Sequence, residues 1–222
     1  MKNLLYPIIF FSLILFGSCN KKKLQLPLID QQGIPEIHNH SSIWIFYELK
    51  NNDTTAILNK NNKIINTHWI FNIDKRLPMK KIAPLLQKMQ ADKNKESMHK
   101  KEGFFNYFSY ADMASNQISL INFTPTAFVF TEQAYQDLLN GHSKNIELDI
   151  QNDALFLDKQ KINMDQLVQK LNDLKINDTL NSLKISLKYP GNTSYQRYLK
   201  TKAYLNKTVI QIDSTEYIYN LK

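Results

Sequence analysis

Histidine and cysteine are the residues of this chain best suited to metal binding or nucleophilic chemistry, and the chain has five of the former and one of the latter. Glu36, His38 and His40 form its histidine cluster, and their alternate spacing could bring one carboxylate and two imidazoles onto a single metal ion. The other histidines are isolated: His68, His99 and His142. The cluster lies in a stretch without apolar periodicity, where nothing would hold the ligands in place. We therefore expect no metal site and no cofactor.

Motifs of hydrolytic or phosphate chemistry are absent from the sequence. It contains no Gly-X-Ser-X-Gly elbow and no paired His-Glu motif of a zinc hydrolase, and its five glycines build no phosphate-binding loop. Carboxylates such as Asp74, Asp112 and Asp149 are scattered, so no acid–base pair can be located. We expect a protein that is not an enzyme. The alternative is a hydrolase that acts on an envelope polymer through carboxylates or a histidine.

An aromatic run forms the other candidate site. On a surface it would bind a partner protein or stack on sugar rings, and in a core it would cover a sheet, which is the favoured interpretation. Its members are Phe104, Phe105, Tyr107, Phe108 and Tyr110. Lysines before the run would give an exposed patch a basic collar for an acidic partner. They are Lys93, Lys95, Lys100 and Lys101.

The N-terminus predicts export. Lys2 gives a positive start, residues 4–16 are almost entirely apolar, and Gly17-Ser18 precede Cys19, the sole cysteine of the chain. Such a segment is typical of a secretory signal peptide and is too short to span a bilayer. One thiol provides neither a disulfide framework nor a cysteine-ligated metal site.

The end of this segment, residues 16–19, resembles the lipobox of bacterial lipoproteins, in which the cysteine is lipidated and becomes the new N-terminus. Phe16 departs from the aliphatic residue usual there. The resemblance implies a palmitate-bearing anchor at Cys19 and a place on a bacterial membrane, facing the periplasm or the cell surface. An uncleaved anchor, or an ordinary signal peptide with an unrelated cysteine, remains the alternative.

The formal net charge of +8 raises the question of nucleic acid. Apart from Arg76 and Arg197, however, the basic side chains are lysines, whereas base readout and tight phosphate recognition favour the guanidinium group. We expect no nucleic-acid partner. The charge is more consistent with attraction to anionic lipid or cell-wall polymer.

Apolar patterning divides the chain into a signal peptide (residues 1–18), a lipid-anchored tether (19–41), an N-terminal α+β region (42–143) and a C-terminal α+β unit (144–222). The predicted strands of the N-terminal region are 43–49, 54–58, 64–73, 118–123 and 127–130. Its predicted helices are one around 82–89, with Pro84 in the first turn, and one capped by Thr131.

The last third has the clearest pattern: strand, strand, helix, strand, helix, strand. Apolar residues alternate with polar ones over 146–150, and residues 164–174 carry one apolar helical face on which Leu167 and Leu171 are central. Strands are predicted at 154–157, 183–187, 208–212 and 217–219, and a helix capped by Thr193 follows residue 192. The predicted fold class is therefore α+β, a mixed sheet with helices packed on one face.

This order resembles the periplasmic domain of the biopolymer-transport ExbD/TolR family, through "IELDIQND", "NMDQLVQKLNDL", "LKISLKYP" and the helix that begins near Tyr195. The resemblance implies a dimerising or ligand-grasping module. No acidic residue lies between Met1 and Cys19, so the family's proton-coupled role does not carry over. Residues 42–143 follow a similar order, which leaves two interpretations open: a diverged copy of the unit, or an extension that completes one sheet. The predicted function is a non-catalytic binding or scaffolding lipoprotein, accessory to an ExbD/TolR-type transport or envelope system, with an envelope protein, peptidoglycan or a second copy as partner.

Overall fold

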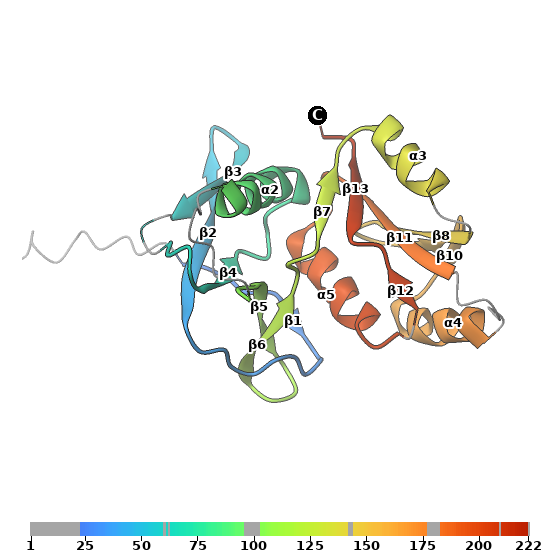
Figure 1. Ribbon diagram of the computed structural model, residues 1–222, viewed down its shortest axis with the longest axis horizontal. Coiled ribbons are helices and arrows are strands. Elements are labelled where there is room, and N and C mark those ends of the chain that lie inside the picture. Colours follow the sequence, from blue (N-terminus) through green and yellow to red (C-terminus); the bar gives the residue numbers. More distant parts are fainter. Residues whose placement is uncertain are drawn as a thin grey trace, which may run out of the picture.

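The computed structural model describes residues 23–59, 61, 63–95, 103–141, 144–176, 183–208 and 210–221. Its described residues confirm the predicted α+β class. They form two mixed β-sheets and four helices, and not the single sheet that the sequence pattern predicted (Figure 1).

The first sheet has the order β1-β5-β4-β2-β3, with β6 antiparallel to β5 on the other side. β2 and β3 form an antiparallel hairpin, whereas β2, β4 and β5 run parallel. Asn51 and Asn52 make the hairpin turn at φ of 48° and 60°, a conformation that asparagine tolerates well. The strands are β1 (Leu28–Ile29), β2 (His40–Lys50), β3 (Asp53–Asn59), β4 (His68–Ile73), β5 (Asn106–Asp112) and β6 (Gln117–Asn122).

The second sheet has the order β10-β9-β8-β11-β13-β7, with β12 pairing with β11. β8 and β9 are antiparallel, while β8, β11, β13 and β7 are parallel. The strands are β7 (Ala127–Val129), β8 (Lys144–Ile150), β9 (Leu155–Leu157), β10 (Gln160–Ile162), β11 (Leu183–Pro190), β12 (Gln211–Ile212) and β13 (Thr215–Tyr219). The predicted order of the C-terminal unit is therefore found in β8, β9, α4, β11, α5 and β12.

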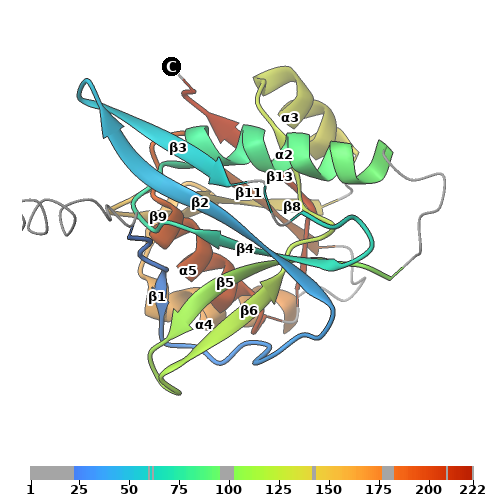
Figure 2. The ribbon, with the colours of Figure 1, turned by 90° about the vertical axis from the view of Figure 1, so that its left-hand side faces the viewer.

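The helices are α2 (Met79–Lys95), α3 (Glu132–Asn140), α4 (Met164–Ile176) and α5 (Tyr195–Leu205). α2 and α5 lie between the two sheets (Figures 1 and 2). The ring of Phe108 on β5 meets Tyr195 of α5 edge-on at 5.6 Å, and Gln87 of α2 donates to the carbonyl of Phe128 on β7 at 3.2 Å. One apolar core therefore runs through both sheets. α3, in contrast, packs on the outer face of the second sheet, where Tyr135 stacks on Tyr217 at 4.6 Å.

Residues 23–41 do not behave as the tether that was predicted over 19–41. Ile29 in β1 is fully buried, and β1 pairs in parallel with β5. The backbone N–H of Gln25 donates to Asp74, and the backbone N–H of Lys75 donates to the carbonyl of Gln25. The segment lacks periodicity because β1, the strand that precedes β2 in it, spans only two residues. The tether prediction is therefore wrong for these residues, and residues 19–22 lie outside the described part.

The predicted boundary at residue 143 also differs from the structure. β7 and α3, expected in the N-terminal region, belong to the second sheet, because β7 pairs with β13.

Pro84 is not in the first turn of its helix, since α2 already begins at Met79. The cap of α5 is Ser194, whose side chain accepts from Arg197, while the Thr193 hydroxyl donates to the carbonyl of Ile150.

The two sheets meet through equivalent turns between a strand and a helix. The backbone N–H of Met79 donates to the carbonyl of Thr193, and that of Tyr195 donates to Leu77, both at 2.8 Å. Two further backbone bonds extend this exchange, from the N–H of Lys80 to the carbonyl of Gly191 and from the N–H of Gln196 to the carbonyl of Lys75. Both sheets also share an order of hairpin partner, hairpin strand, parallel strand and parallel strand (β3-β2-β4-β5 and β9-β8-β11-β13). The two sheets therefore share one strand order and meet through reciprocal backbone bonds.

No helix among the described residues has the length and apolar character needed to cross a lipid bilayer.

Candidate functional site

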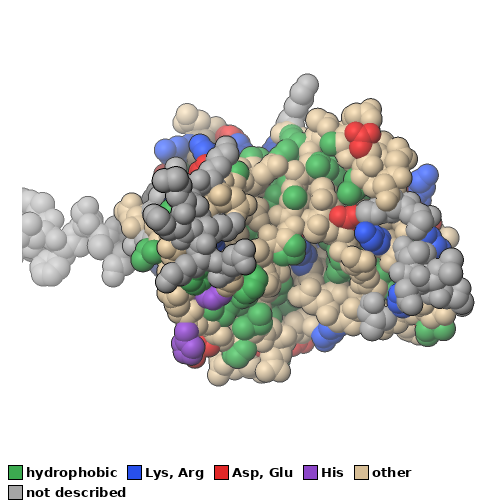
Figure 3. All heavy atoms as spheres, in the orientation of Figure 1, with side chains coloured by type: hydrophobic (Ala, Val, Ile, Leu, Met, Phe, Trp, Pro, Cys, Tyr) green, Lys and Arg blue, Asp and Glu red, His purple; other side chains and the backbone are tan. Residues whose placement is uncertain are grey.

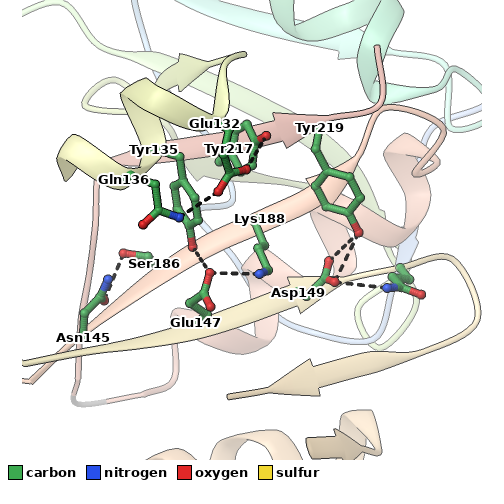
Figure 4. A network of polar contacts seen from close by, with 11 residues as sticks. Glu132, Tyr135, Gln136, Asn145, Glu147, Asp149, Ser186, Lys188, Tyr217 and Tyr219 are labelled. Carbon is green, nitrogen blue, oxygen red and sulfur yellow. Dashed lines mark hydrogen bonds and ion pairs between the residues drawn. The ribbon is translucent and has the colours of Figure 1, made fainter. Parts of the chain in front are cut away.

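A charged cleft lies on the outer face of the second sheet, over the neighbouring strands β8, β9 and β11. Side chains alternate along β8, so that Leu148 and Ile150 point into the core while Glu147 and Asp149 point outward. Lys188 of the neighbouring strand, in register with Asp149, projects on the same side (Figure 4). The cleft has a volume of about 220 Å³. Its lining residues are Glu147, Asp149, Gln151, Phe156, Lys159 and Lys188.

Glu147 is held from two directions. The hydroxyl of Tyr135, on α3, donates to its Oε2 at 2.7 Å, and the ammonium of Lys188 donates to the same oxygen at 2.9 Å. The side chains of Glu147 and Lys188 are 23% and 25% exposed, so this ion pair is largely shielded from water. Glu147 therefore joins α3 to the sheet at the edge of the cleft.

Asp149 is held by a second tyrosine. The hydroxyl of Tyr219, on β13, lies 3.0 and 3.2 Å from its two carboxylate oxygens, and the side-chain amide of Gln151 donates to it at 3.0 Å. Figure 4 shows these contacts side by side with those of Glu147. The two carboxylates are thus oriented by donors from several elements of the chain.

The protonation states follow from these contacts. Burial opposes the charge on Glu147, but the bonds from Tyr135 and Lys188 outweigh it, and its pKa lies below the ordinary value. Burial and the adjacent carboxylates raise the pKa of Tyr135 and Tyr219 above the ordinary value for tyrosine. At neutral pH the tyrosines are therefore donors and Glu147 is a charged acceptor.

This arrangement presents fixed groups of both charges. Two carboxylates and two lysines meet in one half-buried cleft, beside the apolar ring of Phe156. Oriented charges with low water access bind complementary polar groups more strongly than the same charges on an open surface. The chemistry of the cleft suits a ligand that carries both a positive and a negative group.

The structure does not bring the predicted histidine cluster together as a metal site. The imidazole of His38 lies 4.0 Å from Glu36 and both side chains are exposed, while His40 is bonded through Nδ1 to the carbonyl of Ile37. Among the described residues, no three side chains of the metal-binding types form a group that could hold an ion. Cys19, His99 and His142 lie outside the described residues.

The aromatic run is divided between core and surface. Tyr107, Phe108 and Tyr110 are buried in β5, which confirms the interpretation as core for these three. Phe105 is 42% exposed. Lys93 is not part of a surface collar: it is 7% exposed and its ammonium lies over the Trp69 ring at 4.5 Å. The side chain of Lys95, and Lys100 and Lys101, lie outside the described residues.

The scattered carboxylates have separate roles. Asp74 is buried and accepts from both the backbone and the guanidinium of Arg76. Asp112 accepts from Ala114 and Ser115 in the β5–β6 turn. Of Asp74, Asp112 and Asp149, the last lines the cleft and the other two do not.

Sequence reasoning missed Glu147, Lys188 and Tyr135 as site residues. The alternation of Ile146, Leu148 and Ile150 already places residues 147 and 149 on one polar face. No pattern in the sequence shows that α3 returns to that face, because the contact depends on β7 joining the second sheet.

Comparison of the chain with models of protein families, with curated proteins and with solved structures found no match. The resemblance to the ExbD/TolR family therefore rests on the sequence pattern alone.

Proposed function

We propose that this protein is a non-catalytic binding module of the bacterial cell envelope, attached to a membrane by lipid at Cys19. The observation that carries the binding role is the cleft on the second sheet, where Glu147 and Lys188 are oriented and shielded. Lipidation at Cys19 is supported by the sequence that precedes it. The folded part begins close to Cys19, because Gln25 and β1 already bond to the first sheet. The proposed role therefore does not depend on a long tether.

The ligand is an envelope protein or the peptide portion of peptidoglycan, because both carry ammonium and carboxylate groups that match the cleft. Binding would make the protein accessory to a transport or envelope system of the ExbD/TolR type. Homodimerisation is a further role that such a module could have. Within one chain, two similar sheets are already joined by backbone bonds between equivalent turns. Two copies of the chain could associate through surfaces of the same kind.

One observation favours the hydrolase alternative: Glu147 and Asp149 share a cleft. A general acid at neutral pH needs a carboxyl group with a raised pKa, whereas the pKa of Glu147 is lowered. Binding therefore explains the cleft better than catalysis does. Hydrolysis of an envelope polymer by the purified protein, lost in Glu147→Gln, would reverse this preference.

Lipidation is tested by growing cells with an alkyne fatty acid and detecting the label on the protein. The wild-type protein is expected to carry the label and Cys19→Ala to lose it, because Cys19 is the sole thiol. Ser18→Ala, which keeps a small residue before the cysteine, serves as the control and should remain labelled. Label retained on Cys19→Ala would refute the anchor.

The cleft is tested by photo-cross-linking in intact cells, with a photoreactive amino acid in place of Phe156. The ring of Phe156 lines the cleft and is half-buried, so a bound partner should be within reach. Gln169, exposed on α4, takes the same amino acid as the control. We expect a specific adduct from position 156 that Lys188→Ala removes. Equal adducts from both positions would show that the cleft is not the binding surface.

A further inference from the structure

A second cavity lies at the C-terminal end of α2, apart from the charged cleft. Its volume is about 510 Å³, within the range of small-molecule sites. Primary amides and aromatic rings are prominent in its lining. The amides are Asn66, Gln87, Gln90, Asn94 and Asn106, and the rings are those of Phe104 and Phe105. We propose that this cavity binds an uncharged sugar unit of an envelope glycan.

The amide groups are placed by the fold. The side chain of Gln87 donates to the carbonyl of Phe128 at 3.2 Å, and that of Gln90 donates to the carbonyl of Thr126 at 3.1 Å. These bonds fix both amides between α2 and the start of β7. A primary amide has donors on nitrogen and an acceptor oxygen, and a sugar hydroxyl likewise donates and accepts. Several amides around one cavity therefore suit a ring with many hydroxyl groups.

The aromatic rings are equally fixed. The backbone N–H of Phe105 donates to Nδ1 of His68 at 3.0 Å, and the two rings stack at 5.8 Å with 17° between their planes. The ring of Phe104 meets His68 edge-on at 5.4 Å. Figure 3 shows apolar side chains next to the histidines at the lower left, over the first sheet. A rigid ring beside amide groups provides the apolar contact that the C–H face of a sugar requires.

The ammonium group at this cavity is held by neutral groups of the protein. The one lysine in the lining, Lys93, donates to Asn106 at 2.9 Å and to the carbonyl of Thr67 at 3.3 Å, and it lies over the Trp69 ring. The described lining residues include no carboxylate. In the cleft, by contrast, four of the six lining residues are charged. The cavity therefore offers mainly amide and aromatic groups, with one lysine already bonded to the protein, whereas the cleft offers mainly charged groups.

The test is calorimetric titration of the full-length protein in detergent with triacetylchitotriose, an uncharged trisaccharide. We expect saturable binding that weakens at least tenfold in Phe105→Ala and in Ala91→Trp. Ala91 is exposed on α2 and lines the cavity, so a tryptophan there would fill it. Gln169→Trp, at an exposed position of α4, is the control and should bind like the wild type. Circular dichroism checks that each variant is folded.

The proposal is overturned if the wild-type protein shows no saturable heat, or if folded Ala91→Trp binds the sugar unchanged. Binding of a dipeptide with free termini at this cavity, in place of the sugar, would also overturn it. The proposal rests on the proposed function only in the choice of an envelope glycan as probe. Since fatty-acid labelling of Cys19 does not depend on the cavity, the two proposals can fail separately.

Discussion

At the scale of single residues, the inner face of the second sheet carries a buried charge pair. Glu216 is fully buried and accepts from the ammonium of Lys202 on α5 at 2.5 Å and from the hydroxyl of Tyr189 at 2.8 Å. Tyr195, nearby on α5, is also fully buried, yet among the described residues its hydroxyl has no hydrogen-bond partner. A buried hydroxyl with a charged partner stabilises the fold, and one without a partner costs desolvation energy.

Replacing tyrosine by phenylalanine is therefore expected to change the free energy of unfolding in opposite directions at positions 189 and 195. Tyr189→Phe should lower the free energy of unfolding by about 2 kcal/mol, because it removes a hydrogen bond to a buried carboxylate. Tyr195→Phe should raise it by about 1 kcal/mol, because it removes an unpaired hydroxyl. Urea unfolding followed by tryptophan fluorescence measures both. A larger loss in Tyr195→Phe than in Tyr189→Phe would contradict this assignment of the hydroxyl contacts.

At the scale of elements, α4 shows how much of one helix can be predicted. Its apolar stripe predicted that Leu167 and Leu171 face the core, and both are fully buried. The spacing of the apolar residues is enough to predict this burial, because only one face of the helix packs against the rest of the protein. α2 is different: its apolar residues were identified, but its start at Met79 was not, because the turn before it is fixed by the backbone bond to Thr193 of the other sheet.

Leu171→Ala should destabilise the protein by about 2–5 kcal/mol, through lost burial and the cavity left behind. Gln169→Ala, on the exposed side of the same helix, should change the stability by less than about 0.5 kcal/mol. The comparison is made by urea unfolding of the full chain. Equal effects of the two substitutions would mean that the buried face of α4 is misassigned.

At the scale of the whole molecule, the fold class and most strands could be predicted from local patterns, but the grouping of strands into sheets could not. Alternation predicts a strand without specifying its neighbours. Ala127–Val129 was placed with the N-terminal strands, yet pairs with β13 from the C-terminus. β1 went unnoticed because two residues are too few for a periodic signal. The candidate site could not be predicted for the same reason, since Tyr135 and Tyr219 bond to its carboxylates from α3 and β13.

The shared core predicts that the last third cannot fold alone. A fragment of residues 144–222 lacks β7 and α3, and it exposes the face of α5 that meets Phe108. We expect this fragment to show no cooperative urea transition, and the full chain to unfold in one transition. Circular dichroism and fluorescence should give the same midpoint for the full chain. Two separate transitions, or a cooperatively folded fragment, would contradict a single core.

The packing of the N-terminal segment limits how far the folded part can lie from a membrane. If lipid is attached at Cys19, only the residues before Gln25 can extend between the bilayer and the first fixed point of the fold. Six residues span at most about 20 Å when fully extended. The protein would then stay close to its membrane like a short-tethered receptor, and would not range across the envelope. Its ligands, whether peptide or glycan, would have to lie at that surface or be carried to it.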